Sequence, residues 1–190
     1  MFRMRAPTTK SGAKVVFFQH GLFNSAMQWI MHSKDKAPAF KLASQGYDVW
    51  FGNNRGNYYS RKHESLDPMN KKDMAKYFDY SFVELGDYDL PAQIDKVLEE
   101  TGEDKLTYVG HSQGTSQMFY ALAMNEDEMK DKINLFVACS PVMRLGLKKA
   151  RTTEWVVDEI RHGIEDWLKS EYIYELGGDD KSKSNEKLKK

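Results

Sequence analysis

The feature that most constrains the fold is a short apolar run followed at once by a glycine-flanked serine and a helical pattern. Residues 106–110 form the apolar run, and Gly110-His111-Ser112-Gln113-Gly114 is a G-x-S-x-G pentapeptide. The two glycines allow a sharp, strained turn that holds a nucleophile above the edge of a sheet. This context predicts a strand–turn–helix element with Ser112 as the nucleophile. The alternative is a glycine-rich turn without chemistry.

Similar apolar runs recur along the chain and alternate with helical stretches. Strands are predicted over residues 15–19, 47–51 and 133–139, and helices over residues 39–44 and 113–124. A further helix is predicted to begin at Asp89 as its N-cap, with Pro91 in its first turn. Continuous β-branched and aromatic runs indicate strands that are buried on both faces, as in a parallel sheet. The alternation therefore predicts an α/β fold with a mostly parallel sheet and flanking helices.

Composition excludes several classes of protein. Lys and Arg number 28 and so do Asp and Glu, so the chain lacks the basic excess of a nucleic-acid-binding protein. The only cysteine is Cys139, which excludes an internal disulfide and a cysteine-rich zinc site. Phosphate-binding, dinucleotide-binding, zinc and EF-hand motifs are not found. We therefore expect neither a cofactor nor a metal.

A set of motifs in fixed order resembles the acid lipase family, the α/β-hydrolases that include gastric and lysosomal acid lipases. The resemblance covers about residues 15–145 and rests on five segments: Phe18-Gln19-His20-Gly21-Leu22, residues 46–53, Arg55-Gly56-Asn57, Asp89-Leu90-Pro91-Ala92 and residues 108–115. It implies an incomplete α/β-hydrolase fold, the N-terminal portion only, with the start of a helical cap.

The resemblance also implies a chemistry, namely esterase or lipase activity on lipid esters. Ser112 would be the nucleophile, and the backbone N–H groups of Leu22 and Gln113 would form the oxyanion hole. His20, Gly21 and His111 are expected beside this binding site. His20 is expected to shape its loop rather than to transfer protons.

The triad partners of the serine are not recognisable in this sequence. In this fold an Asp and then a His follow the nucleophile, each at the end of a later strand. Asp158 and His162 are spaced i, i+4 on one predicted helix and are better interpreted as a surface or cap pair. We therefore expect the Asp and His to lie outside this sequence and a second polypeptide to complete the sheet. Two alternatives stay open: a non-catalytic structural or interaction subunit derived from a lipase, and a truncated gene product.

The chain is expected to comprise a partial hydrolase core over residues 1–142, a helical cap-like segment over 143–180 and a basic tail over 181–190. Localisation is not determined by the sequence. The family suggests secretion or lysosomes, but there is no signal-peptide pattern at the start and no Asn-x-Ser/Thr sequon. The acid-poor, basic start also fits a mitochondrial targeting segment, although a strand and its turn are the favoured interpretation.

Overall fold

The computed structural model describes residues 1–143, 166, 169 and 170. The chain divides into two compact units. The first unit comprises Met1–Ser60 and Tyr80–Met143, and it contains the whole sheet. The second unit comprises Arg61–Asp79 and Arg144–Lys190.

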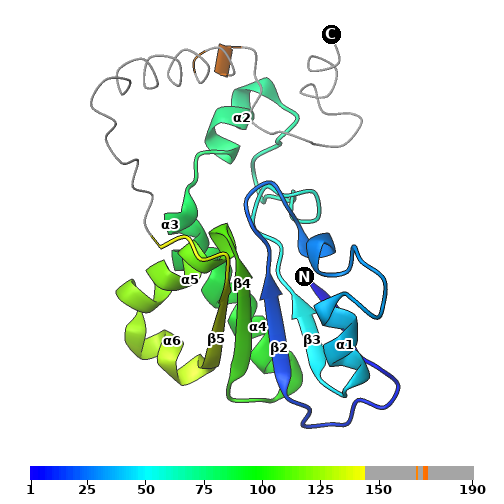
Figure 1. Cartoon of the computed structure of the whole chain (residues 1–190). Coiled ribbons are helices and arrows are strands. Elements are labelled where there is room, and N and C mark those ends of the chain that lie inside the picture. The colour runs from blue at the N-terminus through cyan, green and yellow to red at the C-terminus, as the bar shows by residue number, and fades with distance from the viewer. Residues whose placement is uncertain (144–165, 167–168, 171–190) are drawn as a thin grey trace, which may run out of the picture. The chain divides into compact units, whose positions relative to one another are not determined.

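The first unit is built on a five-stranded sheet in the order β1-β3-β2-β4-β5. The strands are β1 (Phe2–Met4), β2 (Val15–Gln19), β3 (Asp48–Phe51), β4 (Leu106–His111) and β5 (Ile133–Cys139). All neighbouring strands are parallel except β1, which pairs antiparallel with β3 (Figure 1). The predicted mostly parallel α/β sheet is therefore confirmed.

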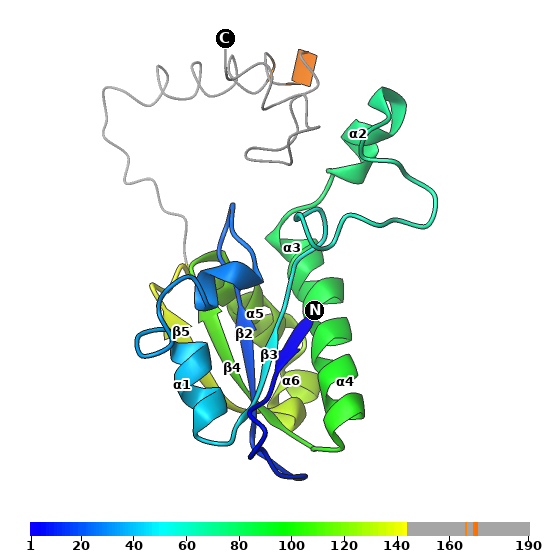
Figure 2. The same cartoon turned by 90° about the vertical axis from the view of Figure 1, so that its right-hand side faces the viewer.

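Helices cover both faces of this sheet. The short 3-10 helix η1 (Ala26–Trp29) and α1 (Pro38–Ser44) lie on one face, whereas α4 (Leu90–Thr101), α5 (Gln113–Met124) and α6 (Glu126–Lys132) lie on the other (Figure 2). Two successive side chains of β2 show why the sequence of this strand is continuously apolar. Phe17 packs in the core under α4 and α5, while Phe18 packs in the core on the α1 face. A strand that is buried on both faces has no position for a polar alternation.

The helix that carries Pro91 begins earlier than predicted, and Asp89 is not its N-cap. Helical backbone starts at α3 (Phe82–Glu84), where Ser81 and Glu84 form a capping box, and continues through a π-helical turn, η2 (Leu85–Asp89). Asp89 has helical φ and ψ angles and makes no capping bond. Its carboxylate instead accepts hydrogen bonds from the backbone N–H and the Nε of Arg55, at 2.7 and 2.6 Å. The better cap upstream makes Asp89 available for this distant partner.

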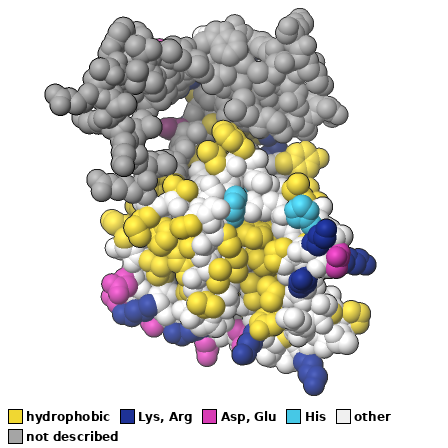
Figure 3. All heavy atoms as spheres, viewed as in Figure 1, with side chains coloured by type: hydrophobic (Ala, Val, Ile, Leu, Met, Phe, Trp, Pro, Cys, Tyr) yellow, Lys and Arg dark blue, Asp and Glu magenta, His cyan; other side chains and the backbone are white. Residues whose placement is uncertain are grey.

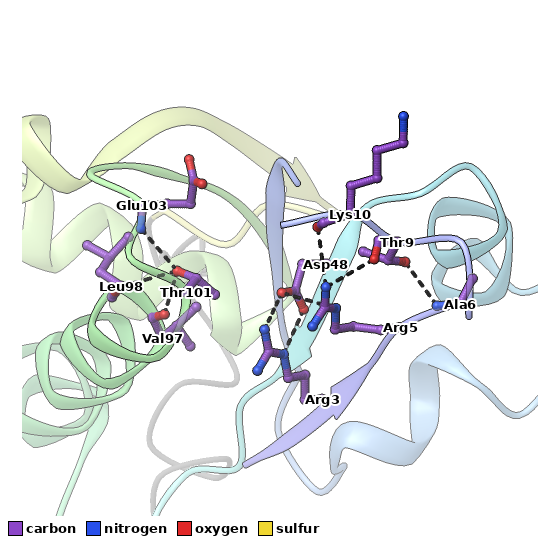
Figure 4. A network of polar contacts seen from close by, with 10 residues as sticks. All are labelled: Arg3, Arg5, Ala6, Thr9, Lys10, Asp48, Val97, Leu98, Thr101 and Glu103. Carbon is purple, nitrogen blue, oxygen red and sulfur yellow. Dashed lines mark hydrogen bonds and ion pairs between the residues drawn. The ribbon is translucent and has the colours of Figure 1, made fainter. Parts of the chain in front are cut away.

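The N-terminal strand β1 is attached to the sheet by a cluster of charged side chains (Figure 4). Arg3 donates from Nε and Nη2 to the two carboxylate oxygens of Asp48, at 3.0 and 2.5 Å. The side chain of Asp48 is 5% exposed, and Arg5 lies within 3.8 Å of it. The Asp48 hydrogen bond raises the pKa of Arg3. This pairing confirms that the basic start of the chain is a strand of this sheet.

The other edge of the sheet is formed by β5, which pairs only with β4 among the described residues. Two of its apolar side chains are open to solvent, Leu135 at 55% exposure and Val137 at 37%. Figure 3 shows hydrophobic side chains gathered on the face of the first unit that is turned to the viewer. An edge of this kind offers unpaired backbone groups and apolar surface to another strand.

The described part of the second unit contains the helix α2 (Lys71–Tyr77), in a stretch that the sequence analysis did not assign to a helix. Asn70 caps α2 by accepting the backbone N–H of Lys72. The Tyr77 hydroxyl donates to the carbonyl of Arg61 at 2.7 Å and so connects the end of α2 to the start of residues 61–79.

Candidate active site

Ser112 lies on a strained turn between β4 and α5. Its backbone angles are φ 50° and ψ −115°, which a residue with a side chain rarely adopts. The turn is fixed on both sides, because the Ser112 N–H donates to the carbonyl of Cys139 at 3.0 Å and the Ser112 carbonyl accepts the N–H of Thr115 at 2.8 Å. The predicted strand–turn–helix element is therefore confirmed.

The two glycines of the pentapeptide are required by close backbone approaches. A Cβ atom on Gly110 would lie 2.7 Å from the carbonyl oxygen of Gly114. A Cβ atom on Gly114 would lie 2.7 Å from the carbonyl oxygen of Gln19 and 2.9 Å from that of His20. The first contact lets β4 and α5 approach each other, and the second lets the start of α5 rest on the end of β2.

The loop after β2 lies directly against this turn. A Cβ atom on Gly21 would lie 3.1 Å from the Cβ of Ser112 and 2.9 Å from the His111 ring. In the part of the chain that the structure describes, no acceptor is bonded to the backbone N–H of Leu22 or of Gln113. The structure thus brings Gly21, Leu22, Ser112 and Gln113 together and leaves two N–H groups of the expected oxyanion hole available.

Two amide side chains hold the ends of this loop. The Gly21 N–H donates to Oε1 of Gln28 at 3.2 Å, and the Ala26 N–H donates to Oδ1 of Asn53 at 3.0 Å. The side chain of Leu22 between them is 56% exposed, so it is not needed for packing in the core. The side chain of Leu22 is therefore not part of the core.

His20 is buried, at 3% exposure, and its two ring nitrogens have opposite roles. Nε2 lies 3.1 Å from the backbone nitrogen of Asn54, whose N–H can only donate, so Nε2 is the acceptor. The proton therefore sits on Nδ1, which lies 2.8 Å from the carbonyl oxygen of Gly21 and donates to it. Burial lowers the pKa of His20, and the bond to Gly21 opposes this only in part. A neutral, fully bonded imidazole is suited to shaping the loop.

His111 is held beside the loop by packing. Its ring stands edge-on to Trp29, with the ring centroids 6.4 Å apart. Its Nδ1 is buried and has no hydrogen-bond partner among the described residues. His111 therefore forms part of the wall next to Gly21 and Ser112.

A buried amide network beneath the turn was not anticipated from the sequence. Nε2 of Gln19 donates to Oδ1 of Asn54 at 2.8 Å, and Nδ2 of Asn54 donates to Oε1 of Gln117 at 2.9 Å. These three side chains come from β2, the loop after β3, and α5. The available sequence signal was that Gln19 ends a buried apolar run and Asn54 closely follows another, which ordinary loop residues also do, whereas Gln117 lies within the predicted helix and gave no signal.

No base is bonded to Ser112 within residues 1–143. Asp158 and His162 lie outside the described residues. In the same described range, no group of three or more His, Cys, Asp or Glu side chains could hold a metal ion. Nor is any described helix both long enough and apolar enough to cross a bilayer.

Comparison with known proteins agrees with the observed fold. Residues 14–176 match the family described as alpha/beta hydrolase fold. The chain is 46% identical over 136 residues to Lipase lipl-1 of Caenorhabditis elegans, covering 71% of this chain and 33% of that protein. It is 46% identical over 128 residues to gastric triacylglycerol lipase of Rattus norvegicus, covering 67% of this chain and 31% of that protein.

The chain therefore spans about a third of the length of these curated relatives. Among solved structures, the epoxide hydrolase VrEH1 from Vigna radiata superposes with a TM-score of 0.50 at 22% identity, covering 86% of this chain and 42% of that one. That likeness shows the fold alone. The resemblance to acid lipases is confirmed by the relatives, and the chain belongs to the α/β hydrolase fold family.

Proposed function

We propose that this chain carries the nucleophile and the oxyanion hole of a lipase-type serine ester hydrolase that acts on lipid esters. The observation that carries the proposal is the placement of Ser112, on a strained turn beside Gly21 with the Leu22 and Gln113 N–H groups available. The likeness to lipases supports an ester as the substrate class.

In the proposed reaction, Oγ of Ser112 attacks the ester carbonyl and its proton passes to a histidine base. The carbonyl oxygen becomes an oxyanion that accepts hydrogen bonds from the N–H groups of Leu22 and Gln113. Collapse of the intermediate expels the alcohol, which takes the proton from the histidine. Water then attacks the acyl-enzyme by the same route and releases the acid.

The oxyanion donors supply a measurable part of the catalysis. Removing one such donor in a serine hydrolase costs about 10²–10³ in turnover. The start of α5 adds to this effect, because the N-terminus of a helix favours negative charge. Both donors are backbone groups, so their placement depends on how the loop and the turn are held.

The histidine base and its orienting aspartate belong to the proposal and are placed outside this sequence. A second polypeptide segment would supply them by adding strands beyond β5. The open edge of β5, with Leu135 and Val137 exposed, supports this site of addition. The same edge favours the second candidate, a structural or interaction subunit derived from a lipase, in which Ser112 is held only by the geometry of the turn.

A fluorophosphonate probe tests the nucleophile in the assembled protein. We expect labelling of Ser112, its loss in Ser112→Ala, and its retention in the control Ser116→Ala, which removes a serine one turn further along α5. Labelling that persists in Ser112→Ala would place the nucleophile elsewhere.

Hydrolysis of p-nitrophenyl butyrate and of emulsified triacylglycerol separates the two candidate functions. Loss of the base costs about 10⁶ in turnover in a triad hydrolase, so the 190 residues alone should show negligible activity. Activity that appears with the completing polypeptide supports the enzyme. An assembled protein without activity favours the structural subunit, whereas turnover by the lone chain that Ser112→Ala abolishes would direct attention to His162 as the base.

A further inference from the structure

The oxyanion loop, residues 20–26, is held by a second loop, residues 53–57, which follows β3. Three bonds connect them: the Asn54 N–H and Nδ2 of Asn57 each lie 3.1 Å from Nε2 of His20, and Oδ1 of Asn53 accepts the Ala26 N–H at 3.0 Å. All three donors or acceptors lie more than twenty residues from their partners. The second loop therefore acts as a scaffold for the first.

The scaffold loop is itself fixed to the helical side of the unit. Asp89 accepts the backbone N–H of Arg55 at 2.7 Å, and the Tyr80 hydroxyl donates to the Arg55 carbonyl at 2.8 Å. Oε1 of Gln93 accepts the Asn53 N–H at 3.1 Å. With the backbone on both sides of Asn54 fixed, the direction of its N–H toward His20 is also fixed.

Asn57 uses every polar atom of its side chain within this arrangement. Nδ2 donates to Oδ1 of Asn53 at 2.8 Å and to Nε2 of His20, and Oδ1 accepts the Tyr59 N–H at 2.8 Å. An imidazole whose Nε2 accepts two donors must carry its proton on Nδ1, where it binds the Gly21 carbonyl. That bond fixes the peptide plane between Gly21 and Leu22, and the N–H of this plane is the Leu22 oxyanion donor.

We propose that Asn57 is a positioning residue for the oxyanion hole: through the His20 imidazole it holds the Gly21–Leu22 peptide so that the Leu22 N–H points into the site. This inference rests on the proposed function, because it assigns a role to the oxyanion hole. It goes further by assigning that role to a side chain on a different loop that does not touch the substrate.

The charged groups around His20 do not disturb this state. Arg55, the charged residue of the scaffold loop, is ion-paired with Asp89 at 2.6 Å. Burial is the main cause of the lowered pKa of His20, and no charged side chain contributes to it. Introducing a carboxylate at position 57 would therefore change the imidazole selectively.

Nuclear magnetic resonance of the uniformly ¹⁵N-labelled chain tests the inference without depending on activity. At pH 8 the wild-type protein should show one neutral His20 tautomer, with its proton on Nδ1. Asn57→Leu removes one of the two donors to Nε2 and leaves the Asn54 N–H in place, so the ¹⁵N signal of His20 Nε2 and the backbone amide signal of Leu22 should both shift. The control Asn125→Leu, which changes an asparagine between α5 and α6 that lies outside both loops, should change neither signal.

Asn57→Asp provides a second variant that preserves the bond to the Tyr59 N–H. Its second oxygen faces the lone pair of Nε2, so His20 should bind another proton and its pKa should rise. The rate of Ser112 phosphonylation in the assembled protein should fall about tenfold in Asn57→Leu, which is less than the ~10²–10³ for a lost donor. The rate should stay at the wild-type value in Asn125→Leu.

The outcomes separate the two proposals. Unchanged His20 Nε2 and Leu22 signals in both Asn57 variants would overturn the positioning role. Changed signals with an unchanged phosphonylation rate would overturn it as well. A wild-type protein that is not labelled at Ser112 would instead overturn the proposed function, and the His20 and Leu22 signals would still decide how the loop is positioned.

Discussion

Replacing Ser112 with glycine should stabilise the protein, although it removes the proposed nucleophile. The residue is held at φ 50° and ψ −115°, and such a conformation costs a residue with a Cβ about 1–3 kcal/mol. Glycine adopts these angles without that cost but loses about 0.5–1 kcal/mol more entropy on folding. Ser112→Gly should therefore unfold with a free energy about 1 kcal/mol higher than Ser112→Ala, which retains the strain.

An alanine within α5, the helix that follows Ser112, supplies the control for the effect of glycine. Ala123 is exposed in α5, so Ala123→Gly should lower the free energy of unfolding by about 1 kcal/mol. The comparison of glycine with alanine thus has opposite signs at positions 112 and 123. Urea denaturation of the four proteins, followed by circular dichroism, measures both differences.

The refuting result is equally specific. If Ser112→Gly is less stable than Ser112→Ala by the amount seen at position 123, then the turn is not strained. The backbone conformation would then no longer indicate that Ser112 is a nucleophile, and a glycine-rich turn without chemistry would be the better interpretation.

Three further predictions concern the supports of the site. Asp48→Asn should lower the free energy of unfolding by about 1–3 kcal/mol, because the Asp48 carboxylate that pairs with Arg3 is only 5% exposed. The Asp95 carboxylate that pairs with Lys132 is 52% exposed, so the control Asp95→Asn should change the free energy of unfolding by about 0–1 kcal/mol in urea denaturation. Gly114→Ala should cost about 1–3 kcal/mol and slow Ser112 labelling, because its Cβ would press on the carbonyls of Gln19 and His20; thermal unfolding at an unchanged temperature would contradict this. Burial lowers the pKa of His20 in the folded protein below the ordinary value of 6.5. Between these two pKa values the unfolded chain binds more protons than the folded chain, so the stability that the neutral His20 contributes is fully present above pH 6.5 and is lost as the pH falls through the folded pKa. In unfolding measured from pH 8 to pH 5, His20→Gln should reduce this acid sensitivity, and an unchanged slope would argue against the buried neutral imidazole.

Local sequence determined the elements that depend on neighbouring residues. The limits of β2 and β5 follow from continuous apolar runs, and α5 begins at Gln113 as predicted, because Gly110 and Gly114 permit the turn at Ser112. The mostly parallel sheet follows from the alternation of such runs with helical stretches. These inferences need no knowledge of distant contacts.

Only the tertiary structure decided what holds the site in place. Asp89 looked like an N-cap by its position before Pro91, yet it binds Arg55, 34 residues away. The sequence analysis named Asn57 only as part of the Arg55-Gly56-Asn57 segment, yet its side-chain amide lies 3.1 Å from Nε2 of His20, 37 residues away. The same residue types satisfy a local turn or a distant partner equally well, and the choice depends on which backbone groups the folded sheet brings within hydrogen-bonding distance. The sequence alone therefore identified the serine and its turn, whereas the folded structure selected the side chains that orient the loop beside it.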